Sequence, residues 1–120
     1  DAMIIDGFGE LDLYFDKSEI VILGGSFIKK GGHNPIEPAQ YGCALISGVF
    51  VYNWQNIYSE MLSEEACIVI ENNNELRNKF EELILNKSKL EYYKKKALEF
   101  SKKKFFDSEI LFNEINFVLN

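Results

Sequence analysis

The stretch best suited to chemistry runs from Gly24 to Pro38 and contains two glycine pairs, two lysines and the only histidine of the chain. Glycine pairs allow positive φ and let a backbone approach a ligand closely. Asn34 is a typical N-cap and Pro35 a typical first helical residue, so a helix is predicted to begin here with its free N–H groups pointing outward. Loop amides, a helix N-terminus and nearby basic side chains suit a phosphate or a carboxylate.

Glu37 falls in the first turn of that predicted helix. The helix dipole favours its ionised form, which suits it to accept hydrogen bonds from a pair of sugar hydroxyls, a ribose-binding role rather than an acid/base role. In the simpler interpretation the glycines only make a turn, Asn34 only caps the helix, and Glu37 completes a capping box. His33 faces a ligand in the first interpretation and solvent in the second. Spacing alone does not choose between them.

Other kinds of site find less support. The glycine spacing matches neither a GxxxxGK[ST] phosphate loop nor a dinucleotide GxGxxG fingerprint, and Gly7–Glu10 is only another glycine-bearing turn. Glu10 and Asp12 are two residues apart and would point in different directions on a helix, so no metal is expected there. A single histidine without a partner nearby in the sequence provides no nucleophilic catalytic set. These residues therefore do not predict a complete catalytic site.

The glycine-rich stretch lies in an alternation of two periodicities. Short apolar runs suit buried strands at 2–5, 19–23, 44–47 and 66–70. Helical spacing separates them at 11–15, 36–41 and 54–62. The alternation predicts an α/β fold, a Rossmann-like parallel sheet of about four strands with helices on both faces. A ligand of such a sheet belongs at the carboxyl ends of the strands, where the Gly24 loop lies.

Residues 72–120 are predicted to form a helical tail behind the β/α part at 1–71, the whole chain making one domain. Three amphipathic helices are expected there, near 76–84, 90–100 and 111–119. Residues 79–104 carry nine lysines against four glutamates. The face that bears these lysines is predicted to be either a solvated surface or a contact for an anionic membrane surface, above all at 87–104.

Composition narrows the class of protein. The chain has 120 residues, 47% of them hydrophobic, and a formal charge of −6, which is typical of a globular fold and argues against a general nucleic-acid binder. No apolar run approaches the roughly 20 residues of a membrane-spanning helix, so this segment is expected to be soluble. Cys43 and Cys67 are predicted to be reduced, buried thiols in a cytosolic setting. The first residue, Asp1, hints at a piece of a longer protein.

These motifs together resemble a known family. The chain is similar to the C-terminal half of the 3-deoxy-D-manno-octulosonic acid (Kdo) transferases, glycosyltransferases of lipopolysaccharide biosynthesis. The likeness extends from about Asp6 to Asn56, with weaker agreement through the helical tail. It rests on Gly9–Leu11, Tyr14, Gly24–Ser26, Gly31–Ala39, Gly48 and Asn53.

The resemblance implies a GT-B enzyme, in which two Rossmann-like domains face each other and Kdo moves from CMP-Kdo to a lipid A precursor with inversion and without a metal. The C-terminal domain of this family holds the nucleotide donor. Glu37 would hold the ribose, and Gly9 and Glu10 match a turn at the cleft edge. Val49 departs from the family, which usually has proline there. The residues that would surround the CMP phosphate and the Kdo carboxylate are Gly25, Ser26, Gly31, Gly32, His33 and Asn34.

The resemblance also implies partners. The general base and the membrane anchor of the family are N-terminal, so this chain alone is expected to be inactive. The intact protein is expected on the cytoplasmic face of the bacterial inner membrane. The lysine-rich helix would contact anionic lipid or pack toward the missing N-terminal domain. Three alternatives stay open: a non-catalytic nucleotide- or phosphate-binding module, a plain interaction domain, and a related GT-B nucleotide-sugar epimerase that prefers uridine nucleotides.

Overall fold

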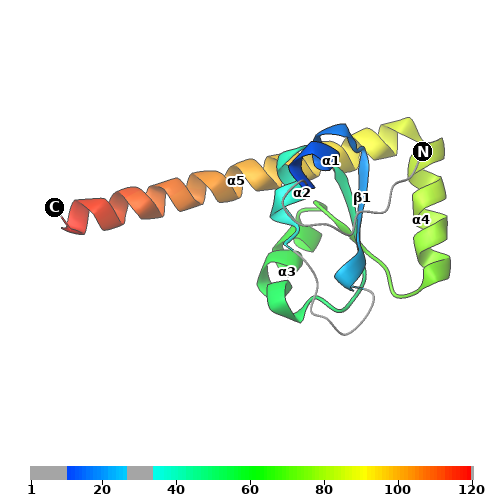
Figure 1. Cartoon of the computed structure of the whole chain (residues 1–120), viewed down its shortest axis with the longest axis horizontal. Coiled ribbons are helices and arrows are strands. Elements are labelled where there is room, and N and C mark those ends of the chain that lie inside the picture. Colours follow the sequence, from blue (N-terminus) through cyan, green and yellow to red (C-terminus); the bar gives the residue numbers. More distant parts are fainter. Residues whose placement is uncertain (1–10, 27–33, 120) are drawn as a thin grey trace.

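The computed structural model describes residues 11–26 and 34–119 of the chain (Figure 1). Three strands form a parallel sheet in the order β1-β2-β3 (Figure 1). The strand expected at 2–5 lies outside the described residues. In chain order the elements are α1 (Leu11–Lys17), β1 (Ile20–Leu23), the 3₁₀ turn η1 (Gly24–Ser26), α2 (Ile36–Gln40), β2 (Ala44–Ser47), the 3₁₀ turn η2 (Tyr52–Trp54), α3 (Gln55–Ser63), β3 (Ile68–Val69), α4 (Asn73–Leu85) and α5 (Lys87–Leu119).

The central strand β2 has a parallel neighbour on each side and is covered by helices. All four of its residues are buried, as expected for a strand with helices on both faces. Ile20 pairs with Ala44 on one side of β2, and Ile46 pairs with Ile68 on the other. Parallel neighbours need crossover connections, and α2 and α3 supply them. The Rossmann-like parallel sheet predicted from the sequence is confirmed.

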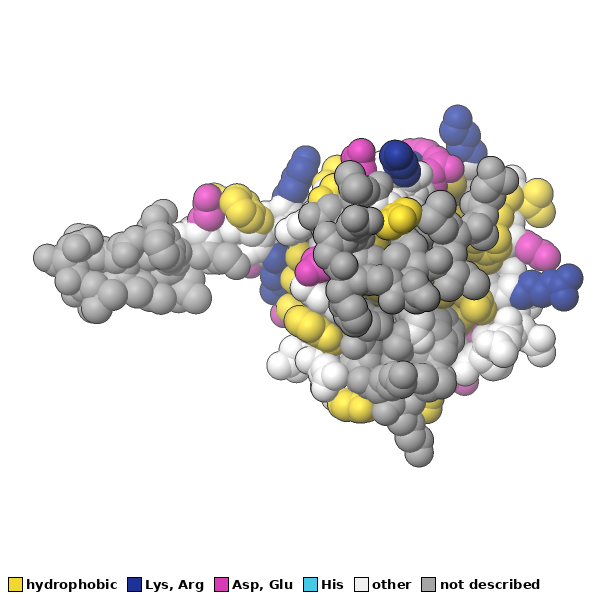
Figure 2. Space-filling model, viewed as in Figure 1, with side chains coloured by type: hydrophobic (Ala, Val, Ile, Leu, Met, Phe, Trp, Pro, Cys, Tyr) yellow, Lys and Arg dark blue, Asp and Glu magenta, His cyan; other side chains and the backbone are white. Residues whose placement is uncertain are grey.

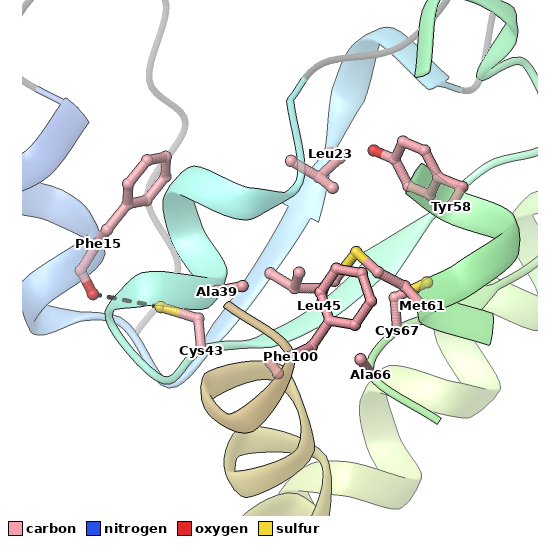
Figure 3. Close-up of a cluster of buried hydrophobic side chains, with 11 residues drawn as sticks. Phe15, Leu23, Ala39, Cys43, Leu45, Tyr58, Met61, Ala66, Cys67 and Phe100 are labelled. Atoms are coloured by element: carbon pink, nitrogen blue, oxygen red, sulfur yellow. Dashed lines mark hydrogen bonds between the residues drawn. The ribbon is translucent and has the colours of Figure 1, made fainter. Parts of the chain in front are cut away.

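Side chains alternate between two hydrophobic clusters, one on each face of the sheet. On one face Leu23 and Leu45 pack with side chains from α1, α2, α3 and α5, among them Met61 and Phe100 (Figure 3). The other face is covered by α4 and the start of α5. Its cluster consists of Ala44, Ile46, Ile68, Ile70, Leu83 and Leu90. The prediction of helices on both faces is therefore confirmed, and α5 contributes to both clusters.

The helical tail differs from the prediction in one respect. The two helices expected near 90–100 and 111–119 are one continuous helix, α5, of 33 residues. The division was wrong because the apolar stripe weakens after Phe100 while neither glycine nor proline interrupts the helix. Beyond that point α5 extends away from the sheet (Figure 1), and Phe105 and Phe106 are each 62% exposed. Within the described residues, no helix is long and apolar enough to cross a membrane.

Candidate functional site

The carboxyl ends of β1 and β2 meet at one edge of the sheet. Leu23, the last residue of β1, pairs with Ser47, the last residue of β2. The chain passes directly from Leu23 into η1 and from Ser47 into Gly48. Ligands of open parallel sheets bind beyond this edge. The first glycine pair of the predicted binding loop is thus at the position that the sequence indicated.

Ser26 joins the two loops that leave this edge. Its side chain is fully buried, and its hydroxyl donates a hydrogen bond to the carbonyl of Leu23. The same oxygen accepts a hydrogen bond from the N–H of Gly48 at 2.7 Å. A second link follows, since the N–H of Phe50 donates to the carbonyl of Ser26 at 2.9 Å. The Ser26 hydroxyl therefore binds two backbone groups of the chain itself, and its contact with a donor stays a prediction.

Ser47 and Tyr58 continue this polar cluster into α3. Ser47 is buried, and its hydroxyl donates to the carbonyl of Gly48 at 3.0 Å. Tyr58 is 1% exposed and shares a hydrogen bond with Ser47, and its hydroxyl points toward the end of β1 beside Leu23 (Figure 3). Burial raises the pKa of Tyr58 to about 12, so the phenol stays neutral. Sequence reasoning placed Tyr58 only on the apolar stripe of its helix.

Asn34 and Glu37 lie on the other side of residues 27–33 in the chain. The side chain of Asn34 caps the N–H of Ile36 by accepting a hydrogen bond at 3.0 Å, but the N-cap residue of α2 is Pro35, one residue later than predicted. The regular helix begins at Ile36 rather than at Pro35, a difference of one residue that is common at helix ends. Glu37 is exposed in the first turn of α2. Its carboxylate is accessible to a ligand from solution.

The structure describes some of the predicted donor contacts and not others. Gly25 and Ser26 lie in η1, next to the loop after β2. Beside them Gly24 has open space, because a Cβ added there would meet no atom of the described residues within 4 Å. Across residues 11–26 and 34–119, His, Cys, Asp and Glu side chains form no group that could hold a metal ion. The predicted contacts Gly9, Glu10, Gly31, Gly32 and His33 lie outside the described residues.

Both cysteines are free and buried, as predicted. The Cys43 sulfur lies 3.3 Å from the carbonyl oxygens of Phe15 and of Ser18 (the Phe15 contact is dashed in Figure 3). Burial raises the pKa of the Cys43 thiol to about 11 and that of Cys67 to about 12. Both side chains are therefore neutral thiols inside the fold and poor nucleophiles.

Most lysines of the basic segment pair with carboxylates of the same chain, and on the face shown in Figure 2 basic and acidic side chains lie near one another. Within the described part of the chain, Lys87, Lys96 and Lys102 have no carboxylate partner. Lys96 instead lies over the Tyr92 ring. The ion pairs are Lys79 and Lys89 with Glu82, Lys94 with Glu19 and Glu91, Lys95 with Glu99, Lys103 with Glu64, and Lys104 with Glu60.

Known proteins share much of this sequence, although no protein-family model matches the chain. A 3-deoxy-D-manno-octulosonic acid transferase of Rickettsia conorii is 38% identical over 104 residues, which are 85% of this chain and 22% of the relative. The transferase of Aquifex aeolicus is 30% identical over 95 residues, 79% of this chain and 27% of the relative. The chain thus spans less than a third of the length of either relative.

A solved structure shares the fold. The C-terminal CMP-Kdo binding domain of WaaA from Acinetobacter baumannii superposes with a TM-score of 0.74 at 25% identity, over 80% of this chain and 50% of that one. The fold and the loops at the carboxyl edge define the class as a Rossmann-like domain of a glycosyltransferase. Within that class, the chain belongs to the Kdo transferases and corresponds to part of their C-terminal domain.

Proposed function

We propose that this chain is the donor-binding part of a glycosyltransferase that moves Kdo from CMP-Kdo to a lipid A precursor in lipopolysaccharide biosynthesis. The observation that carries the proposal is the meeting of η1 and the Gly48 loop at the carboxyl edge of the sheet. The identity to Kdo transferases and the likeness to a solved CMP-Kdo binding domain support it.

The chemistry of the donor fits the residues of the site. CMP-Kdo carries a phosphodiester and a carboxylate, both of which accept hydrogen bonds from loop amides such as those of a glycine-rich turn. The exposed carboxylate of Glu37 accepts hydrogen bonds from the ribose hydroxyls. Gly9 and Glu10, outside the described residues, are assigned to the cleft edge by their resemblance to the family alone. We assign the contacts to the phosphate and the Kdo carboxylate to Gly25, Gly31, Gly32, His33 and Asn34.

The whole enzyme needs further parts. We assign the general base to the N-terminal domain of the same protein, so the chain by itself binds the donor without transferring the sugar. Transfer proceeds with inversion and without a metal. The acceptor is a membrane lipid precursor, which places the whole protein on the cytoplasmic face of the bacterial inner membrane.

A membrane contact of the lysine-rich helix at 87–104 is part of this proposal. Only Lys87, Lys96 and Lys102 are free of carboxylate partners among its described lysines, so any attraction to anionic lipid comes mainly from these three. Flotation of the chain with liposomes of neutral lipid and of anionic lipid tests the contact. Equal flotation in both would identify this face as an ordinary solvated surface.

An NMR titration of the ¹⁵N-labelled chain with CMP tests the proposed function. The largest amide shifts are expected at Gly24, Gly25, Gly48 and Glu37. The first turn of α4 is the control, because Asn72 caps it by accepting from the N–H of Glu75 at 2.9 Å, much as Asn34 caps α2. Shifts that gather on α4 or on the lysines of α5, or no shifts at all, would contradict the proposal.

A further inference from the structure

Gly48 is held at both of its polar backbone groups. Its N–H donates to the Ser26 hydroxyl at 2.7 Å, and its carbonyl accepts from the Ser47 hydroxyl at 3.0 Å. Gly48 and both serines are buried, so these hydrogen bonds are shielded from water. Tyr58 fixes Ser47 in turn through its own hydrogen bond. These hydrogen bonds therefore fix the backbone of the loop after β2 at the point where it leaves the sheet.

Ser26 is the member of this cluster that reaches across the chain. Its partners are Leu23, the last residue of β1, and Gly48, which follows β2 and is 22 residues away in sequence. We call the hydrogen bonds of the Ser26 hydroxyl to these two residues the Ser26 bridge. A buried N–H without a partner is costly, so removal of the hydroxyl would favour conformations in which the Gly48 loop moves away from η1.

We infer that Ser26 is a positioning residue for the donor: its hydroxyl holds η1 and the Gly48 loop together rather than binding the donor itself. The inference rests on the proposed function. When the two loops are already fixed, the donor does not have to order them as it binds. When the loops are in the binding arrangement only part of the time, the observed affinity is lower in proportion to that fraction. The Ser26 bridge would thus determine donor affinity without touching the donor.

Ser26→Ala tests the inference, and Ser101→Ala is its matched control. Ser101 is also buried, at 3% exposure, and its hydroxyl donates to the carbonyl of Leu98, three residues back, as that of Ser26 does to Leu23. Among the hydrogen bonds described, Ser101 makes none to another loop. The control therefore loses the local hydrogen bond and keeps the bridge between loops.

Titration calorimetry with CMP gives the first measurement. Ser26→Ala is expected to weaken CMP binding about tenfold, the loss that one buried hydrogen bond represents, and Ser101→Ala less than about twofold. Ser26→Cys keeps a weaker acceptor of similar size and is expected to fall between the wild type and Ser26→Ala. It also provides the test if Ser26→Ala does not fold.

Hydrogen exchange of the Gly48 amide gives a measurement that a general loss of stability would not reproduce. Exchange is expected to accelerate in Ser26→Ala but not in Ser101→Ala, and saturating CMP is expected to restore its protection. Wild-type affinity in Ser26→Ala, or equal weakening in both variants, would overturn the inference and leave the proposed function intact. Failure of the wild type to bind CMP would overturn both.

Discussion

Two buried side chains, Ser26 and Cys43, occupy opposite edges of the same sheet. Cys43 precedes β2 at the amino edge, and its thiol lies within hydrogen-bonding distance of the carbonyls of Phe15 and Ser18. Ser26 follows β1 at the carboxyl edge and joins Leu23 to Gly48. Each side chain fixes a backbone segment, so the means of stabilisation is similar at the two edges.

What surrounds these side chains differs. At the amino edge, α5 lies close to the sheet: Lys94 pairs with Glu19 at 3.4 Å, and a Cβ on Gly42 would come within 4.0 Å of Leu98. At the carboxyl edge, Gly24 has open space beside it. Helix side chains thus cover the amino edge, while among the described residues of the carboxyl edge Gly24 has open space beside it. The comparison teaches that, within residues 11–26 and 34–119, the edge proposed for the donor is the one where a glycine faces open space.

Two carboxylates give the largest expected contrast between the edges. Glu37→Gln should weaken CMP binding by about 1.5–3 kcal/mol, the loss of hydrogen bonds to a charged group, with the fold intact. Glu19→Gln at the amino edge is the control and should leave CMP affinity unchanged. Calorimetry on both variants checks this. Unchanged affinity in Glu37→Gln would mean that its carboxylate only belongs to the first turn of α2.

Two glycines should respond in opposite ways. Gly42 has φ of +69°, so Gly42→Ala should lower the free energy of unfolding by about 1–2 kcal/mol and leave CMP binding unchanged. Gly24→Ala should leave stability unchanged or raise it by up to about 1 kcal/mol, because no described atom of the chain opposes the methyl group. The same methyl should weaken CMP binding by occupying space beside η1.

Urea unfolding together with CMP titration measures both effects. Weakened CMP binding in Gly42→Ala would contradict the claim that CMP binding depends on the carboxyl edge and not on the amino edge. Full affinity in Gly24→Ala would show that the donor lies elsewhere.

The buried thiols predict a pH dependence of stability. Their pKa values rise from 9.0 in the unfolded chain to about 11 for Cys43 and about 12 for Cys67. Above pH 9 the unfolded chain therefore loses protons that the folded chain retains. The contribution of the two thiols to the free energy of unfolding should therefore be constant below pH 9. Above pH 9 it should fall by up to about 1.4 kcal/mol per pH unit for each thiol.

Urea unfolding between pH 8 and pH 11 checks the effect, with Cys43→Ala as the comparison. The slope above pH 9 should be smaller in that variant. An equal slope in the variant and the wild type would contradict the assignment of Cys43.

Lys103 should give the smallest effect. It pairs at 2.9 Å, on the surface, with Glu64, which follows α3. Lys103→Gln should lower stability only slightly, less at high salt, and leave CMP binding unchanged. Thermal unfolding at low and high salt measures it. A larger loss would mean that this ion pair anchors α5 more strongly than an exposed pair should.

The sequence predicted the parts of the fold that follow from periodicity. The strand at 44–47 and the helices from Leu11 and near Trp54 lie where their apolar spacing indicated. The strand predicted at 66–70 is shorter and consists of Ile68–Val69, although the N–H of Ile70 still donates to the carbonyl of Ser47 at 2.9 Å. The sequence did not predict that α5 is continuous. The apolar stripe weakens where the helix leaves the sheet, and in a sequence this resembles the end of a helix.

The sequence likewise predicted one part of the site and missed another. The cap at Asn34 is local chemistry within three residues, and the sequence was sufficient for it. The Ser26 bridge joins residues 22 apart through one small polar side chain, which leaves no periodic signal. The nearest signal was the placement of a serine and a glycine at the ends of two predicted parallel strands.

Calorimetric titration of the chain with CMP and with UMP tests the central claim most directly. The two nucleotides share ribose and phosphate, so a difference between them reports the base. We expect CMP to bind and UMP to bind more weakly, because the donor of the Kdo transferases is a cytidine nucleotide. Equal or tighter binding of UMP would contradict the assignment of this edge as a CMP-Kdo site.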